Sequence, residues 1–162
     1  MQSYEKDVHA WSVEQAALLR ERKFDQLDVE HLAEEIANVA RSEERELARR
    51  LAELMASLLA WQELPDGRGA VARTVIRYQR KGIMHMLEES PSLAEAMNTR
   101  RWLDVAWTDA MATAAADAHV DHLPEACPWS MREQVLAEGW LPGLEVAADV
   151  IAEIAKKGRE RK

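Results

Sequence analysis

The feature that most constrains the fold is a long stretch, from residue 28 to residue 64, that contains neither glycine nor proline. Apolar residues recur along it at spacings of three and four: Val29, Leu32, Ala33, Ile36, Ala40, Leu47, Leu51, Leu54, Leu58 and Trp61. This spacing is typical of an amphipathic α-helix, and Asp28 is a residue type that favours helix N-termini. The pattern predicts one helix of about 30 to 35 residues, longer than most helices of globular proteins.

A turn and a second long helix follow. The segment 64–69, Leu-Pro-Asp-Gly-Arg-Gly, combines proline and glycine and therefore predicts a chain reversal. Beyond it, helical spacing resumes at Val71, Val75, Ile76, Ile83 and Leu87. The two helices are predicted to form an antiparallel hairpin.

Helix signals also dominate the rest of the chain. Ser12 with Gln15, and Ser130 with Glu133, have the spacing of capping boxes, and Ser90-Pro91 has the favoured order of an N-cap followed by proline. The helix after Ser90 is expected to bend near residues 98–99. No segment alternates as a strand would, so the sequence predicts an all-α fold, an irregular helical bundle built around the long antiparallel hairpin.

We expect two parts along the chain: a single helical domain over residues 1–142 and an additional amphipathic helix with a basic tail over residues 143–162. The apolar stripe of that last helix comprises Leu144, Ala147, Ala148, Ile151 and Ile154. We expect it to pack back on its own domain or to mediate a homodimer.

Composition excludes several classes of protein. The net charge of −8 argues against a binder of nucleic-acid backbones, and no apolar run is long enough to span a membrane. A single cysteine, Cys127, permits no internal disulfide, and the N-terminus lacks the apolar region of a secretion signal. These features favour a reducing cytoplasm.

Several motifs, in order from residue 4 to residue 142, resemble the bacterial family called domain of unknown function 29. They include Trp11 with the run that follows it, Phe24-Asp25-x-Leu27-Asp28, Leu32-Ala33-Glu34-Glu35-Ile36, Leu58-Leu59-x-Trp61-Gln62, Gln79-Arg80, Ser90-Pro91-Ser92-Leu93, Pro124-x-x-Cys127-Pro128-Trp129 and Trp140-x-Pro142. The resemblance implies a helical protein without an established activity. Residues 143–162 fall outside it.

A first candidate site lies on the first long helix, on the side that the apolar spacing leaves polar. His31, Glu34 and Glu35 cluster there, and a histidine with carboxylates three and four residues later can reach one metal ion. No second helix supplies a matching set. We therefore expect a solvated outer face, with a metal site as the alternative.

A second candidate comprises His119, His122 and Cys127. These are acceptable zinc ligands, but a structural site needs four ligands and a catalytic site three in fixed geometry. Cys127 has no identifiable base beside it and is expected to anchor its loop, together with Trp129, against the core. The sequence indicates no cofactor and no complete catalytic set.

A third candidate is a basic stripe on the second long helix. Arg73, Arg77 and Lys81 are spaced one turn apart, and Arg68 and Arg80 lie nearby. Such a stripe can bind a phosphate or an acidic partner helix. Alternatively, it pairs with the protein's own acids or is solvated.

Polar residues on apolar stripes complete the candidates. Glu43 lies between Ala40 and Leu47, and Gln79 lies between Ile76 and Ile83. A buried carboxylate must be paired or protonated, so Glu43 is the strongest single candidate for a functional site. Hairpin register places Glu43 level with Ser90, where it is expected to cap the next helix.

Two hypotheses about function follow. The first is a non-enzymatic helical module that binds a protein partner or itself, because no catalytic set is complete. The alternative is a small metal-binding protein or enzyme that uses the face of His31, Glu34 and Glu35, or buried Glu43, with Gln79 and Arg80 as further polar candidates.

Overall fold

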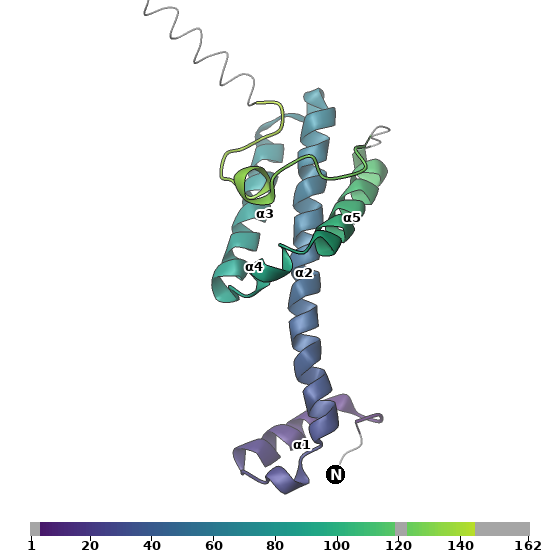
Figure 1. Ribbon diagram of the computed structural model, residues 1–162, viewed down its shortest axis with the longest axis vertical. Helices are drawn as coiled ribbons and strands as arrows, with labels where there is room; N and C mark the ends of the chain where they lie inside the picture. The colour runs from purple at the N-terminus through teal and green to yellow at the C-terminus, as the bar shows by residue number, and fades with distance from the viewer. Residues whose placement is uncertain (1–3, 119–122, 145–162) are drawn as a thin grey trace, which may run out of the picture. The chain divides into compact units, whose positions relative to one another are not determined.

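A computed structural model describes residues 4–118 and 123–144, and these residues form helices and turns without a strand (Figure 1). The elements are α1 (Val8–Arg20), η1 (Phe24–Gln26), α2 (Val29–Glu63), η2 (Pro65–Gly67), α3 (Ala70–Glu89), α4 (Leu93–Ala96), α5 (Arg100–Ala118) and η3 (Met131–Val135). The predicted all-α class is confirmed. The predicted C-terminal helix lies, beyond Leu144, outside the described residues.

The long helix and the hairpin are as predicted. α2 has 35 residues, and the short turn η2 connects it to the 20 residues of α3. Arg68 Nε donates to the carbonyl of Trp61 at 2.7 Å, and its Nη2 donates to that of Gln62 at 2.7 Å. These bonds satisfy two of the carbonyl groups that any helix leaves unpaired at its C-terminus, so the break after α2 is stabilised by a specific contact.

The chain divides into two compact units, Met1–Glu43 and Glu44–Lys162, which meet in sequence within α2. In the first unit, α1 packs on the start of α2 through buried Trp11 and Gln15. Trp11 Nε1 donates to Asp28 Oδ2 at 3.1 Å, and the backbone N–H of Asp28 donates to Gln15 Oε1 at 2.8 Å. The contact is therefore held by hydrogen bonds as well as by apolar area.

This packing overturns the predicted orientation of the first half of α2. Val29 and Ile36, predicted to be core residues, are 65% and 70% exposed. α1 instead covers the side that carries His31, which was predicted to be solvated and is half-buried, as is Asp28, the predicted N-cap. A helical wheel ranks faces by apolar content, whereas here Trp11 and Gln15 hydrogen-bond to the side chain and the backbone N–H of Asp28 at the start of α2.

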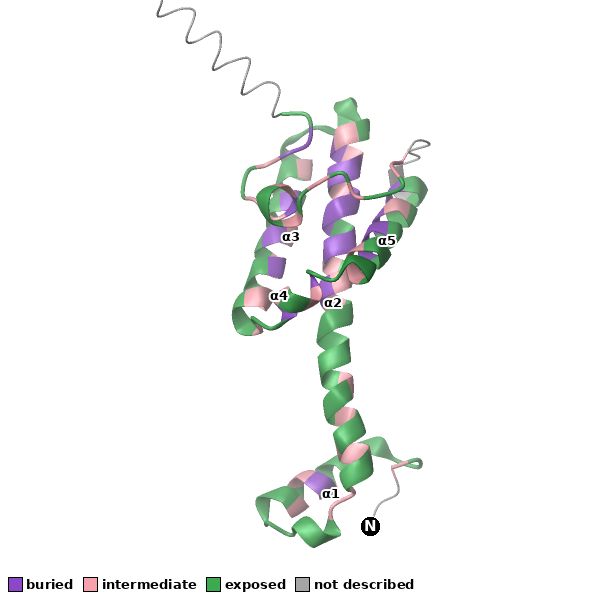
Figure 2. Ribbon diagram, in the orientation of Figure 1, coloured by how far each residue is buried: buried purple, intermediate pink, exposed green. Residues whose placement is uncertain are grey.

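The second unit holds the main core. Buried residues cluster on the C-terminal half of α2 and on the facing sides of α3 and α5 (Figure 2). They comprise Leu47, Leu51, Ala52, Leu54, Met55, Ala56, Leu58, Leu59, Trp61, Ile76, Ile83, Leu93, Met97, Ala106, Trp107, Ala110, Ala114, Val135 and Leu141. The predicted apolar stripe of α2 is thus buried from Leu47 onward. On α3, Val71 and Val75 are exposed, contrary to the prediction, because Ile76 and Ile83 define its buried side.

Three indole rings tie the irregular segment after α5 to the core. Trp107, Trp129 and Trp140 meet edge to face, with successive ring centroids 5.7 Å apart. Trp107 Nε1 also donates to the carbonyl of Pro124 at 3.1 Å. Edge-to-face pairs are favoured by the ring quadrupoles, so these contacts fix a segment that lacks regular secondary structure.

Helix starts were predicted less well than helices. α1 begins at Val8 with Asp7 as its N-cap, and Ser12 is an interior residue whose hydroxyl donates to the carbonyl of His9. Ser90-Pro91 forms a turn, and α4 begins only at Leu93. The bend expected near residues 98–99 is a complete break between α4 and α5.

The predicted capping box at Ser130 is present with a different partner. The Ser130 hydroxyl accepts from the backbone N–H of Glu133 at 3.4 Å, as expected. The reciprocal bond, from the backbone N–H of Ser130, goes to Gln134 Oε1 at 2.7 Å instead of Glu133. The helix that follows, η3, is a single π-helical turn. Its wider winding places Gln134, four residues after Ser130, within reach of the Ser130 backbone N–H.

Candidate functional site

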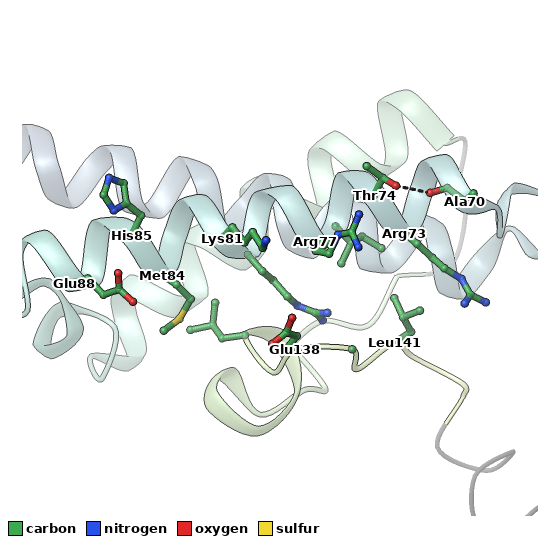
Figure 3. Close-up of a pocket in the computed structure, with 14 residues that line it drawn as sticks. Ala70, Arg73, Thr74, Arg77, Lys81, Met84, His85, Glu88, Glu138 and Leu141 are labelled. Carbon is green, nitrogen blue, oxygen red and sulfur yellow. Dashed lines mark hydrogen bonds between the residues drawn. The ribbon is translucent and has the colours of Figure 1, made fainter.

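A groove of about 700 Å³ runs along α3 in the second unit (Figure 3). One wall is α3, and the other is formed by the residues that follow η3. The lining residues are Ala70, Arg73, Thr74, Ile76, Arg77, Arg80, Lys81, Met84, His85, Glu88, Leu136, Glu138, Gly139 and Leu141. Its volume lies within the range of about 300–1,000 Å³ that is typical of ligand pockets.

The helical period explains how one element lines both core and groove. Ile76 and Ile83 are buried, and Arg77 and Met84, the residues that follow them, line the groove together with Ile76. Arg73 and Lys81 lie one turn before and one turn after Arg77. Arg73, Arg77 and Lys81 are therefore in line and span about 12 Å along the axis. All three are exposed, and the predicted basic stripe is a rim of this groove.

Arg80 is the buried member of the basic set. It is only 6% exposed, and its Nε donates to the carbonyl of Val135 at 2.8 Å. Its Nη2 donates to the carbonyl of Trp140 at 2.8 Å and, at 3.4 Å, to that of Gln134. The side chain of Arg80 thus connects α3 to the backbone of the segment that forms the opposite wall of the groove.

The buried Arg80 guanidinium has no counter-charge in the part of the chain that the structure describes: none of the ion pairs there includes it. Burial lowers the pKa of Arg80, and no carboxylate opposes that effect. Carbonyl dipoles solvate the charge in place of water. The groove floor therefore carries a desolvated positive charge.

The electrostatic character of the groove is positive overall. Four cationic side chains, Arg73, Arg77, Arg80 and Lys81, face two carboxylates, Glu88 and Glu138. The guanidinium of Arg73 also lies over the ring of Trp61, 5.3 Å from its centroid. Apolar side chains also line the groove, with Met84 from α3 and Leu136 and Leu141 opposite it. A positive, partly apolar groove stands out in a chain with a net charge of −8.

The metal candidate on α2 is used structurally. His31 Nδ1 lies 2.8 Å from Asp28 Oδ2, and the His31 ring stacks on Tyr4 with centroids 4.1 Å apart. Tyr4 donates its hydroxyl proton to Glu35, which raises the pKa of Tyr4 to about 12. Burial acts to raise the pKa of Asp28, but hydrogen bonds from His31 and Trp11 outweigh it and leave that pKa lowered. Glu34 is exposed.

Only one residue of the predicted zinc candidate, Cys127, lies within the described part of the chain. His119 and His122 lie outside the described residues. Cys127 is half-buried, packs against the core with Trp129, and donates its thiol to the Trp129 carbonyl at 3.6 Å, so the predicted anchoring contact is confirmed. Burial raises the pKa of the Cys127 thiol. Within residues 4–118 and 123–144, no three His, Cys, Asp or Glu side chains converge as metal ligands would.

The expected burial of Glu43 is wrong. Glu43 is exposed, and burial on α2 begins at Leu47. α3, with 20 residues at about 1.5 Å each, is long enough to cover only the last 20 or so residues of α2. The N–H groups at the start of α4 bond to the carbonyls of Ser90, Pro91 and Ser92, so they need no carboxylate cap.

Gln79 lies beside the groove without joining it. Its side chain is half-buried, and its Oε1 is buried without a hydrogen bond from any described residue. Of the predicted polar candidates, the structure places only Arg80 in the groove.

Sequence reasoning missed the far wall of the groove: Leu136, Glu138 and Leu141 lie about 55 to 60 positions from their neighbours on α3. No periodic pattern links such distant residues. The available signal was the pairing of two motifs, Gln79-Arg80 and Trp140-x-Pro142, which the hydrogen bond from Arg80 to the Trp140 carbonyl joins in space.

A family model described as "Domain of unknown function DUF29" matches residues 3–141. The chain belongs to this family. The match confirms the resemblance seen in the motifs, and it covers both compact units and the groove up to Leu141. No curated protein and no solved structure matches the chain. No helix among the described residues is long and apolar enough to cross a membrane.

Proposed function

We propose that the protein is a non-enzymatic helical binding module, and that the groove along α3 receives an acidic amphipathic helix of a partner protein. The observation that carries this proposal is the line of exposed cations Arg73, Arg77 and Lys81 beside the apolar lining residues of the groove. A partner helix with carboxylates one turn apart matches that line residue by residue.

The shape of the cationic set favours an extended partner. Binding of a small anion requires positive groups that converge on one point, whereas these three are spread over about 12 Å along a straight helix. Met84 and Leu141 offer apolar surface beside them, as in other grooves that receive the apolar face of a helix. Side chains of both kinds are thus placed for the two faces of one helix.

The groove lacks the features of a catalytic site. Its titratable lining residues are cations along α3, two exposed carboxylates, Glu88 and Glu138, and one exposed histidine, His85, which pairs with Glu89 on α3. Among the described residues, no nucleophile lies beside a base in this groove. Recognition is therefore the function that the groove residues support best.

The test is a titration with a designed, fluorescently labelled helical peptide that has Glu at three successive turns and Leu on the adjoining face. Fluorescence anisotropy of the peptide measures its affinity for the full chain. We expect the acidic peptide to bind, with an affinity that falls as salt is added, and a matched peptide with Lys at the three Glu positions not to bind.

Charge reversal locates the site. The double variant Arg77→Glu, Lys81→Glu should weaken binding about tenfold or more, because two attractive pairs of roughly 0.5 kcal/mol become repulsive. The control Arg41→Glu, Arg45→Glu makes the same change of net charge on exposed residues of α2. Equal losses in both variants would show non-specific attraction and contradict the proposal, as would equal binding of the acidic and basic peptides.

A further inference from the structure

Within the groove, the structure assigns to Arg80 an anchoring subsite for one carboxylate carried on a short apolar stem. This inference rests on the proposed function where the carboxylate belongs to a docked partner segment. The rim cations attract any acidic segment, whereas this subsite would select one carboxylate at one position.

The first step is the supply of donors. The recorded hydrogen bonds of Arg80 use Nε and Nη2, which donate to the carbonyls of Val135, Gln134 and Trp140. A guanidinium has five N–H donors, and the pair on Nη1 is not used in these bonds. Because Arg80 lines the groove, we assign these two donors to a ligand bound there.

The second step is the missing counter-charge. Arg80 forms no ion pair with any described residue, although only 6% of its surface is exposed to solvent. A desolvated charge without a partner attracts an anion far more strongly than an exposed one does. A carboxylate that reached Nη1 would complete a charge-assisted hydrogen bond in a site that is already partly dry.

The third step is rigidity. Bonds to the carbonyls of Val135 and Trp140, both at 2.8 Å, hold the guanidinium before any ligand arrives. A preorganised donor loses little side-chain freedom on binding. Exposed Arg77 and Lys81, by contrast, must be ordered by the ligand, so Arg80 is suited to selecting it and they are suited to attracting it.

The fourth step is the surroundings. Ile76, Leu136 and Leu141 line the groove together with Arg80. Apolar walls around a buried cation exclude a highly hydrated anion and accept a carboxylate whose stem is apolar. The side chain of a glutamate in an apolar helix face and a free short-chain organic acid share this chemistry.

The experiment follows the Nε–H resonance of Arg80 in ¹⁵N-labelled full-length protein. Three probes are titrated: hexanoate, its neutral isostere hexanamide, and the acidic peptide. We expect hexanoate and the peptide to shift this resonance and hexanamide to leave it unchanged. Wild-type protein suffices, so the result does not depend on whether a variant folds.

A peptide series separates the two sources of the carboxylate. Single Glu→Gln changes at each of its three acidic positions should weaken binding unequally, with about tenfold loss or more at the anchoring position and less at the others. Excess hexanoate should compete for that position. The variant Arg80→Lys should remove the difference between the three positions, whereas Arg77→Lys should preserve it.

The outcomes also separate this inference from the proposed function. If the peptide binds and the Arg80 resonance does not move, the rim alone acts and the inference is wrong. If hexanoate shifts the resonance and no peptide binds, the subsite stands, the free acid is its ligand, and the proposed function fails. A shift with hexanamide equal to that with hexanoate would overturn the assignment of a charge-selective subsite.

Discussion

At the scale of single residues, arginines of this chain have two different roles. Arg68 donates to the carbonyls at the end of α2, and Arg80 donates to the carbonyls of Val135, at the end of η3, and of Trp140. Arg77, three residues before Arg80, is exposed on the rim. Sequence alone does not distinguish a solvated arginine from one that holds a wall in place, because the difference lies in backbone carbonyls supplied from elsewhere.

Replacement of Arg80 should therefore cost stability as well as binding. Arg80→Met removes the hydrogen bonds that the guanidinium donates to the carbonyls of Val135 and Trp140, and we expect the free energy of unfolding to fall by about 2 kcal/mol or more. Arg77→Met, on the exposed rim, should change it by less than about 0.5 kcal/mol. Urea denaturation of both variants measures the two values, and equal effects would contradict the buried role of Arg80.

The pH at which Tyr4 ionises should test the hydrogen bond between Tyr4 and Glu35 in the first unit. Its hydrogen bond to Glu35 raises the pKa of Tyr4 from 10.0 to about 12. Because the folded pKa is the higher one, this contribution to stability is complete below about pH 10 and is lost as the pH rises through 12. In a Tyr78→Phe background, Tyr4 is the sole tyrosine, and its phenolate absorbance should appear late. Adding Glu35→Gln should move the transition toward pH 10, and an unchanged midpoint would exclude the hydrogen bond.

At the scale of elements, α2 shows what sequence patterns decide. The period of three and four residues, without glycine or proline, was sufficient to predict its length and the hairpin with α3. The same pattern misassigned the partner of its first half, because α1 is positioned by the hydrogen bonds of Trp11 and Gln15. The length of a helix follows from its own sequence. Which of its faces is buried also depends on the elements that pack against it, and a helical wheel carries no information about them.

The candidate site divides in the same way. The rim stripe of Arg73, Arg77 and Lys81 is periodic and was predicted. The role of Arg80 was not, because it depends on carbonyls about 55 to 60 residues away. Glu43 was misjudged because apolar neighbours imply burial only where another element covers them.

The boundary of burial on α2 gives a direct test of this reading. Exposed Glu43→Leu should change the free energy of unfolding by no more than about 0.5 kcal/mol. Leu47→Ala, four residues later and fully buried, should cost about 2–5 kcal/mol. Chemical denaturation of the two variants checks the contrast, and a large loss for Glu43→Leu would show that the carboxylate is buried and paired after all.

At the scale of the whole molecule, charge distribution is the property that bears on function. The chain has 29 acidic residues and 21 lysines and arginines, yet its groove is lined by four of those cations and two carboxylates. Under the proposed function, the acidic remainder would repel long polyanions and confine attraction to a short segment that complements the groove.

The measurement that tests the central claim most directly is an NMR titration of ¹⁵N-labelled full-length protein with the acidic helical peptide. The account predicts that backbone amide shifts concentrate on two segments, Arg73–Met84 of α3 and Leu136–Leu141 opposite it, because these line the groove. Residues of α1 should remain unchanged. Shifts spread evenly over exposed basic residues, or concentrated on the uncovered apolar face of Val29 and Ile36, would contradict the claim that the α3 groove is the binding site.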